Sequence, residues 1–308
     1  MRCRPIWYVN RSNARSSFLP LALPTQKPTL HHSNGSNSLG TDLHSAIGVF
    51  DSGIGGLSIL KALRATLPYE NFVYVADSGH APYGERDANF VVERTRAIAH
   101  HLLSDSTLCL KALVIACNTA TAAAIHLLRQ DDFTCPIIVV EPALKPALTL
   151  SKTRRIGVMA TRATLNSHKF KTLLASMSGQ SEFICQPCDG LATAIEHDDT
   201  SKIIALCADY TGVMGRFGIK KNEIDTLVLG CTHYPFAAAH LQLMVGTEVH
   251  LVDTGEPVAR HTAHLLTSRT PHSYPGQLAL RSSGDPFALS QATQRWLGLQ
   301  VETQRLTI

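Results

Sequence analysis

Residues 113–119 read Leu-Val-Ile-Ala-Cys-Asn-Thr, and residues 227–233 read Leu-Val-Leu-Gly-Cys-Thr-His. In each stretch, an apolar run typical of a buried strand ends in a small residue and a cysteine, before a helical pattern begins. A second pair of similar stretches precedes them, with Ile-Gly-Val-Phe-Asp-Ser at 47–52 and Ile-Gly-Val-Met-Ala-Thr at 156–161. The two pairs occur in the same order, at offsets of 109 and 114 residues. They predict two related lobes, each with a cysteine at the end of a strand.

Short apolar runs alternate with longer helical patterns from Ile47 onward. The predicted strands are 47–50, 72–76, 112–116, 137–140, 155–159, 226–229 and 249–252, and the predicted long helices are 89–104, 119–129, 165–176 and 203–217. Near-continuous apolar strands alternating with helices are typical of doubly wound α/β folds with parallel sheets. We therefore expect two pseudo-symmetric α/β lobes with the active site between them. The first lobe is predicted to comprise 45–136 and 255–308, and the second 137–254.

The formal charge of +4 belongs to the first 44 residues, which hold five basic residues and one acidic residue. The other 264 residues hold 23 of each sign, so they are neutral overall. This balance disfavours a nucleic-acid partner, because that affinity comes largely from Lys and Arg at phosphates. No run approaches 18 apolar residues, so no membrane span or membrane partner is predicted. The eight widely spread cysteines are too sparse for a disulfide scaffold and fit a reducing, cytoplasmic location.

Residues 1–44 lack a sustained helical or alternating pattern, and they contain Pro20, Pro24, Pro28 and the run Ser-Asn-Gly-Ser-Asn-Ser at 33–38. We expect a disordered extension, or an upstream start codon read into the chain. A targeting peptide is the alternative, because the stretch contains Arg and Ser and is almost free of acids. A secretory signal is disfavoured, because the apolar patch at 18–24 is short and interrupted by prolines.

The two cysteines suit a particular chemistry. Open α/β sheets bind ligands beyond the carboxyl ends of their strands, and a helix N-terminus favours a thiolate. A free thiol titrates at about 8.5, so a modest shift would make it a usable base. Inverting a stereocentre by proton transfer needs a base on one face and an acid on the other. Cys117 and Cys231 could supply that pair. Four hydroxyl or amide side chains beside them could hold carboxylates without an arginine: Ser52, Asn118, Thr119 and Thr232.

Several motifs together resemble the glutamate racemases. They are Gly48-Val-Phe-Asp-Ser-Gly-Ile-Gly-Gly-Leu57, Pro82-Tyr-Gly84, Ala116-Cys-Asn-Thr-Ala120, Glu141-Pro142, Gly230-Cys-Thr-His-Tyr-Pro235 and Ser283-Gly-Asp-Pro286. The match covers essentially all of 46–304 in order. Each short string is common, but the combination is specific to this family.

The resemblance implies a cofactor-independent racemase that interconverts L- and D-glutamate and supplies D-glutamate to peptidoglycan, as a homodimer. It implies that Cys231 acts on the L-face and Cys117 on the D-face, and that no metal is bound. The catalytic residues carried over are Cys117, Cys231, Asp51, His233 and Glu196. The substrate-binding residues carried over are Asp51, Ser52, Tyr83, Gly84, Asn118, Thr119, Thr232 and His233.

Two positions depart from the family pattern. His80 stands where an arginine is common before the Pro-Tyr-Gly turn, and this change could alter substrate contacts. Asp189 stands where a proline commonly follows the cysteine at 188, which weakens the assignment of Glu196.

A dinucleotide-binding loop is an alternative interpretation of residues 51–56. Gly53 and Gly55 fit the first two positions of G-x-G-x-x-G, and Asp77 ends the next strand. The third glycine position is Ser58, however, and Asp51 would place a carboxylate close to a pyrophosphate. We therefore favour an acid/base role for this turn.

A different substrate, a metal site and a pyridoxal phosphate cofactor are weaker interpretations of the same sequence. Another two-cysteine racemase, such as one acting on aspartate, shares the same chemistry. Cys185-x-x-Cys188 is only half of a zinc site, and alternation along an extended turn would point Cys231 and His233 apart. A pyridoxal phosphate enzyme needs a Schiff-base lysine, but the lysines at 61, 145 and 169 lie in helical patterns.

Overall fold

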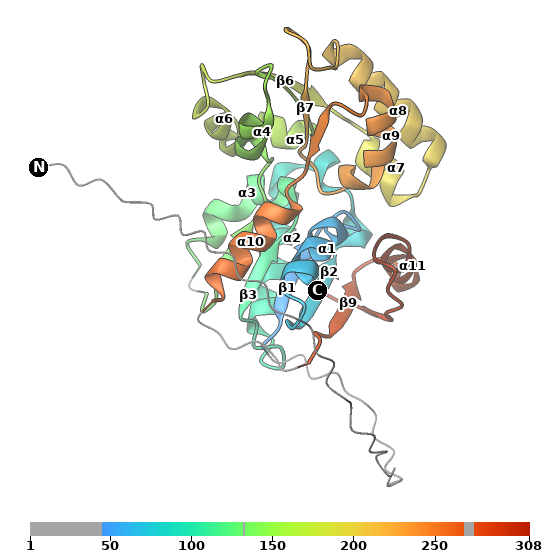
Figure 1. Cartoon of the computed structure of the whole chain (residues 1–308). Helices are drawn as coiled ribbons and strands as arrows, with labels where there is room; N and C mark the ends of the chain where they lie inside the picture. Colours follow the sequence, from blue (N-terminus) through green and yellow to red (C-terminus); the bar gives the residue numbers. More distant parts are fainter. Residues whose placement is uncertain (1–44, 132, 268–273) are drawn as a thin grey trace, which may run out of the picture. The chain divides into compact units, whose positions relative to one another are not determined.

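Two fully parallel sheets organise the computed structural model, which describes residues 45–131, 133–267 and 274–308 (Figure 1). The first has the strand order β10-β9-β2-β1-β3-β4, and the second has the order β6-β5-β7-β8. The strands are β1 (Ile47–Asp51), β2 (Phe72–Ala76), β3 (Ala112–Ile115), β4 (Ile137–Val139), β5 (Arg155–Ala160), β6 (Glu182–Pro187), β7 (Thr226–Leu229), β8 (His250–Val252), β9 (Leu278–Ser282) and β10 (Thr303–Arg305). Both sheets lie in the same compact unit of the chain.

Helices connect the strands and cover the sheets. They are α1 (Leu57–Thr66), α2 (Ala88–Ser104), α3 (Asn118–Leu128), α4 (Leu144–Leu150), α5 (Arg162–Asn166), α6 (His168–Ala175), α7 (Leu191–Glu196), α8 (Thr200–Met214), α9 (Ala238–Val245), α10 (Gly255–Leu265) and α11 (Pro286–Leu297). Three short 3₁₀ turns are η1 (Ser78–His80), η2 (Tyr83–Glu85) and η3 (Tyr234–Ala237).

The two sheets share one topology. In the first, β1 pairs with β2 on one side and β3 on the other, and β3 pairs with β4. In the second, β5 pairs with β6 and β7, and β7 pairs with β8. The repeated sequence stretches are the equivalent central strands, β1 with β5 and β3 with β7. The strand order therefore reverses between these two central strands in each sheet, the place where such sheets bind ligands.

Both faces of the central strands are buried, which explains their continuous apolar runs. Alternate residues of the first sheet face two different clusters. Val49 and Tyr74 pack with residues of α1, whereas Phe50 and Val75 pack with residues of α2 and α3. In the second sheet, Ile156 and Val158 pack with residues of α4 and α6. The remaining face packs with residues of α7, α8 and α9.

The predicted α/β fold class, with two parallel-sheet lobes, is confirmed. Three strands escaped the sequence prediction: β6, β9 and β10. Strands β6 and β10 lie at sheet edges and are partly exposed, so they lack a continuous apolar run. The predicted helix at 165–176 starts earlier and is broken at Ser167. The Ser167 backbone is extended, and the Ser167 hydroxyl caps α6 by accepting from the N–H of Phe170.

The predicted lobe boundary at 136 precedes β4, but β4 pairs with β3 in the first sheet. The apolar run alone could not assign β4 to a sheet, because pairing is a tertiary contact. Helix α10 follows β8 in sequence and packs against α1. We therefore propose that the second lobe begins after β4 and that the first resumes at α10. The extension at 1–44 lies outside the described residues. No helix among the described residues is long and apolar enough to cross a membrane.

A buried ion pair stabilises the first sheet at the amino ends of its strands, just before β3 begins. The Lys111 ammonium contacts the Glu70 carboxylate, and both side chains are at least 95% buried. The Lys111 main chain also joins a neighbouring segment, since its N–H donates to the carbonyl of Ala46. Two charges this deeply buried depend on each other, because removing one leaves the other without compensation.

We predict that Lys111→Met lowers the free energy of unfolding by about 3–5 kcal/mol, because Glu70 is left charged and buried. The double variant Lys111→Met/Glu70→Leu should recover most of this loss. Arg260→Ala, which breaks an exposed pair with Glu256, is the control and should cost less than about 1 kcal/mol. Urea denaturation measures all three. Equal losses in the single and double variants would contradict the prediction.

Candidate active site

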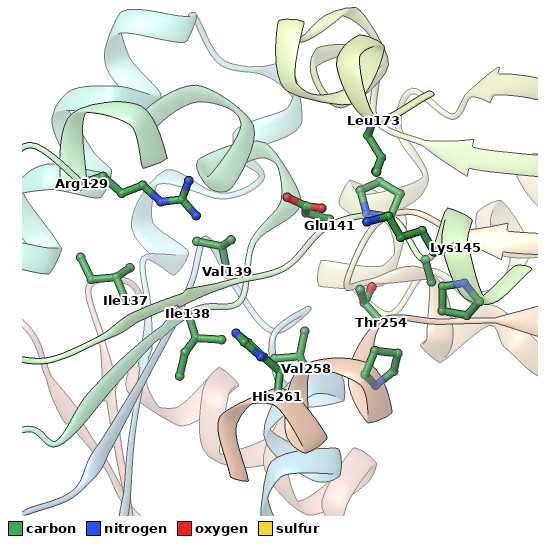
Figure 2. Close-up of a pocket in the computed structure, with 14 residues that line it drawn as sticks. Arg129, Ile137, Ile138, Val139, Glu141, Lys145, Leu173, Thr254, Val258 and His261 are labelled. Carbon is green, nitrogen blue, oxygen red and sulfur yellow. The ribbon is translucent and has the colours of Figure 1, made fainter. Parts of the chain in front are cut away.

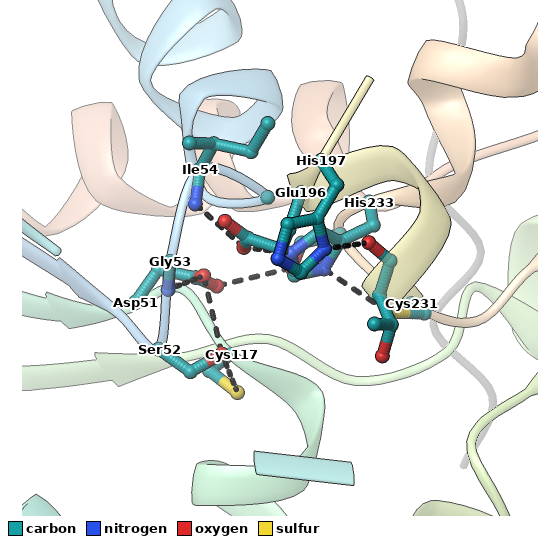
Figure 3. Close-up of polar contacts among 12 residues, drawn as sticks. Asp51, Ser52, Gly53, Ile54, Cys117, Glu196, His197, Cys231 and His233 are labelled. Carbon is teal, nitrogen blue, oxygen red and sulfur yellow. Dashed lines mark hydrogen bonds and ion pairs between the residues drawn. The ribbon is translucent and has the colours of Figure 1, made fainter. Parts of the chain in front are cut away.

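The ends of three strands, β1, β3 and β7, carry Asp51 and the two predicted catalytic cysteines. Asp51 is the last residue of β1, and Cys117 follows β3, the neighbouring strand. Cys231 follows β7 in the second sheet. All three side chains are buried, and they lie in one network of polar contacts (Figure 3). The two cysteines thus occupy matching positions in the two sheets.

Cys117 caps the N-terminus of α3. Its sulfur accepts from the Ala120 N–H at 3.4 Å, and its thiol points at the Ser52 hydroxyl at 3.7 Å. The helix terminus was expected to favour the thiolate, but the balance here is the opposite. Burial and the nearby carboxylate of Asp51 raise the pKa of the Cys117 thiol well above its usual range. Loss of hydration outweighs one backbone N–H, so Cys117 is a protonated thiol at neutral pH.

Asp51 connects the two cysteine turns. Its Oδ1 accepts from the Gly53 N–H at 2.8 Å, and its Oδ2 accepts from the Thr232 hydroxyl at 3.0 Å. The Ser52 hydroxyl lies 3.5 Å from Oδ1. Burial raises the pKa of Asp51 to about 6, although the charge of His233 opposes this shift. The carboxyl can therefore exchange a proton near neutral pH.

Cys231, His233 and Glu196 form a chain of polar contacts. The Cys231 sulfur lies 3.6 Å from His233 Nδ1, and His233 Nε2 lies 2.5 Å from Glu196 Oε1. Burial acts to lower the pKa of His233, but its contacts with Cys231 and Glu196 outweigh it and raise that pKa well above its usual value. An imidazolium therefore lies beside the Cys231 sulfur.

The expectation that Cys231 and His233 point apart was wrong. Side chains two positions apart in an extended segment lie on the same side, so alternation gave no ground for that expectation. His233 has φ −75° and ψ −34° and immediately precedes η3, and its Nδ1 lies 3.6 Å from the Cys231 sulfur. The proximity of Glu196 to His233 likewise supports the assignment of Glu196, which the change at Asp189 had weakened.

The glycine-rich turn is shaped to receive Glu196 and His233. A Cβ at Gly53 would overlap the Glu196 carboxylate, and a Cβ at Gly55 would overlap the His233 ring. Glu196 Oε1 also accepts from the Ile54 N–H at 2.9 Å. These glycines are needed for space, since neither has a positive φ.

The same contacts disfavour the dinucleotide interpretation. A pyrophosphate would need the backbone N–H groups of this turn, but those of Gly53 and Ile54 donate to protein carboxylates. Asp77 would have to reach a ribose, but it is fully buried and bonded to Arg94 and Tyr83. The turn is therefore occupied by acid/base residues of the chain.

The remaining predicted binding residues surround the network. Asn118 is buried, and its amide has no hydrogen-bond partner among the described residues. The Thr119 hydroxyl lies 3.1 Å from that of Thr161, across the two sheets. Tyr83 donates to Asp77, and Gly84 lies against the Thr161 side chain, which leaves no room for a Cβ. An unpaired buried amide is costly unless a ligand satisfies it, so Asn118 is a candidate substrate contact.

Three supporting residues were not predicted from the sequence. The Tyr74 hydroxyl donates to the Gly53 carbonyl at 2.6 Å, and the Ser58 hydroxyl to the Thr232 carbonyl at 2.8 Å. Both fix the turns that carry the acid/base groups. Only the third, Thr161, had a usable sequence signal, because it aligns with Ser52 in the repeat.

Two positions that depart from the family pattern lie outside the network. Asp189 is exposed and pairs with Arg162 at 2.5 Å. His80 Nδ1 lies 3.0 Å from Asp77 Oδ1.

The cysteines outside the network do not form a recognisable metal site. Cys185 is half-buried within β6, and Cys188 is buried just beyond it. Within the part of the chain that the structure describes, no three His, Cys, Asp or Glu side chains are grouped to hold a metal ion.

A separate pocket of about 350 Å³ lies beside the segments that join the sheets (Figure 2). Arg129, Lys145 and His261 contribute its basic side chains, and Glu141 its carboxylate. Apolar residues of β4 line its wall. Neither cysteine of the network borders this pocket, so it is not the candidate catalytic site.

Comparisons of the sequence and of the structure with known proteins indicate the same family. A family model described as Asp/Glu/Hydantoin racemase matches residues 56–262. A glutamate racemase of Ralstonia nicotianae is 43% identical over 272 residues, which cover 87% of this chain and 95% of that relative.

Solved structures agree. Glutamate racemase isoform RacE1 from Bacillus anthracis superposes with a TM-score of 0.75 at 28% identity, covering 86% of this chain and 98% of that one. The Francisella tularensis glutamate racemase, solved in complex with D-glutamate, superposes with a TM-score of 0.72 at 25% identity, covering 86% and 98%. The chain therefore belongs to the glutamate racemase group of the Asp/Glu/hydantoin racemase family and is an isomerase.

Proposed function

We propose that this enzyme interconverts L- and D-glutamate without a cofactor, by proton transfer between Cys117 and Cys231. The observation that carries the proposal is the pair of buried thiols at equivalent strand ends, each with its own acid/base assistants. The relatives named glutamate racemases supply the substrate class. In the cell, the product D-glutamate would serve peptidoglycan synthesis in the cytoplasm.

In the L-to-D direction, the Cys231 thiolate removes the Cα proton and becomes a thiol. The Cys117 thiol delivers its proton to the opposite face of the carbanion and becomes a thiolate. The His233 imidazolium, held by Glu196, balances the negative charge of Cys231 before the transfer. The raised pKa of Cys117 suits the acid role in this direction.

In the D-to-L direction, Cys117 must first lose its proton. Ser52 lies between the Cys117 thiol and Asp51, so the hydroxyl can pass that proton to the carboxylate. Asp51, with its pKa of about 6, is mostly ionised at pH 7 and can accept it. The two thiols thus have different assistants, a carboxyl through a hydroxyl for Cys117 and an imidazolium for Cys231.

Substrate carboxylates would be held by neutral donors. Asn118 offers an unpaired amide, and hydroxyls of Ser52, Thr119 and Thr232 lie around the thiols. The turn η2, which contains Tyr83 and Gly84, packs against α3, the helix that begins with Asn118 and Thr119. A homodimer is part of this proposal, as the family resemblance implies.

The substrate is tested with L-glutamate in heavy water, without added cofactor. We expect exchange of the Cα hydrogen and appearance of D-glutamate, followed by NMR and chiral chromatography. L-Aspartate is the matched comparison, and its turnover in place of glutamate would make the enzyme an aspartate racemase. If both amino acids stay inert while a nucleotide binds, the racemase proposal is wrong.

The cysteine roles predict different partial reactions. Cys117→Ala and Cys231→Ala should each lower racemisation at least 10²–10⁴-fold, the usual contribution of an acid/base group. Cys117→Ala should still exchange the Cα hydrogen of L-glutamate with heavy water, because Cys231 can return a deuteron to the same face. Cys231→Ala should do the same only with D-glutamate. Cys207→Ala, a buried thiol in α8, is the control and should keep full turnover. Racemisation retained in either active-site variant would exclude the two-base mechanism.

Glu196→Gln should shift the pH dependence of the L-to-D reaction. Loss of the carboxylate lowers the pKa of His233, so the imidazolium is lost at a lower pH. We expect kcat to fall about 10²-fold, the lower end of the range for an acid/base group, and the alkaline limb of its pH profile to move to lower pH. Glu182→Gln, at an exposed surface carboxylate, is the control. An unchanged alkaline limb would show that Glu196 does not act through His233.

A further inference from the structure

Asp77 follows β2 and is completely buried, yet it has no part in the proton transfers above. Side chains from three separate segments point their donors at its carboxylate. The Tyr83 hydroxyl lies at 2.6 Å, the Ser283 hydroxyl at 2.6 Å and His80 Nδ1 at 3.0 Å. Arg94 binds both oxygens, with Nη2 at 2.7 Å from Oδ1 and Nε at 3.0 Å from Oδ2.

This carboxylate is a fixed anion. Burial acts to raise its pKa, but the hydrogen bonds from Arg94, Ser283, Tyr83 and His80 outweigh it and lower the pKa of Asp77 to about 2. Asp77 is therefore ionised throughout the neutral range and does not exchange protons there. Charge-assisted hydrogen bonds of this kind are stronger and more directional than neutral ones. They suit a group that holds others in place.

The group held by Asp77 is the turn at Tyr83 and Gly84. The Tyr83 ring packs edge-on against Phe50 and Phe90. Burial and the nearby charge of Asp77 raise the pKa of Tyr83 well above its usual range, so its phenol stays protonated and donates to Asp77. The turn η2 packs against α3 of the first sheet and α5 of the second. The position of this turn therefore affects both sides of the site.

The turn also reaches the helix that carries Glu196. Glu85 Oε1 accepts from the Thr193 hydroxyl at 2.7 Å, and Thr193 lies in α7. A Cβ at Gly84 would overlap the Thr161 side chain. A shift of the turn would therefore disturb contacts on the second sheet as well.

The C-terminal segment completes the arrangement. Ser283 lies more than 200 positions from Asp77 in sequence, and its hydroxyl also accepts from the Gly79 N–H at 3.2 Å. Gly284 comes so close to the turn that a Cβ would lie 2.8 Å from the Gly79 nitrogen. The Ser283-Gly284 motif, which takes no part in the chemistry, thus has a physical purpose beside the Pro82-Tyr-Gly84 turn.

We propose that Asp77 and Ser283 are positioning residues, which hold the Tyr83–Gly84 turn in the geometry that receives the substrate. The inference rests on the proposed function, because it assigns that turn to substrate binding. Neither residue touches the reacting atoms. Their loss should therefore weaken substrate binding while leaving proton transfer in the bound complex largely intact.

Ser283→Ala is the first test, because it removes one donor and leaves the Asp77–Arg94 pair. We expect KM for both glutamate isomers to rise about five- to tenfold, the effect of losing one hydrogen bond of ordinary strength, because Arg94 still holds Asp77, while kcat changes less than twofold. Ser290→Ala removes a hydroxyl pair with Thr303 in the same C-terminal region and is the matched control. The assays are run well below the melting temperature of each variant, so that a change in KM reflects the position of the turn and not partial unfolding. An unchanged KM in Ser283→Ala, with wild-type enzyme racemising glutamate normally, would overturn the proposal.

Tyr83→Phe is the second test and keeps the ring while removing the bond to Asp77. If Ser283 and Tyr83 act through one carboxylate, the KM of the double variant should rise less than the product of the single effects. Independent, fully multiplicative effects would contradict the shared role. A wild-type enzyme inactive on glutamate would instead refute the proposed function, so the two failures are distinguishable.

Discussion

One oxygen of Glu196 sets the geometry of the site. Oε1 lies 2.5 Å from His233 Nε2 and accepts from the Ile54 N–H, so it joins the cysteine turn of the second sheet to the glycine-rich turn of the first. That approach leaves no room for side chains at Gly53 and Gly55. Glu196 also occupies the Ile54 N–H, and Asp51 the Gly53 N–H, so neither is left to bind a phosphate. A loop that looks like a nucleotide site in sequence is therefore part of an acid/base network.

Burial acts on every ionisable group here, and its outcome depends on the partners available. Asp51 accepts hydrogen bonds from a backbone N–H and two hydroxyls but has no ion pair among the described residues, and its pKa rises to about 6. Asp77 has Arg94 on both oxygens, and its pKa falls to about 2. Equally buried carboxylates are thus separated into a group that titrates and a group that stays charged. This difference fits Asp51 for proton exchange and Asp77 for positioning.

Much of the site could be predicted because the fold is repeated. The stretches around Cys117 and Cys231 mark equivalent strands, and equivalent strands of parallel sheets end at the same kind of edge. Glu196 came only from the family resemblance, because a residue at the end of a short helix has no local pattern that marks it. The pKa of Cys117 was wrongly expected to fall, since sequence reports the helix terminus but not the degree of burial. The direction of His233 was missed because alternation was applied to residues two positions apart, which share one side of an extended segment.

The sequence by itself determined the fold class, the family and the two thiols, because apolar periodicity and the repeated strand-end motifs are local properties. It also showed that residues 45–308, which are neutral overall, hold every motif assigned to the chemistry, whereas the excess positive charge lies in residues 1–44. Only the tertiary structure decided which groups meet: Glu196 with His233, Ser283 with Asp77, and β4 with the first sheet. The physical reason is that these pairings join residues 24 to 206 positions apart in the sequence. Neither distance nor desolvation is encoded in a local run of residues.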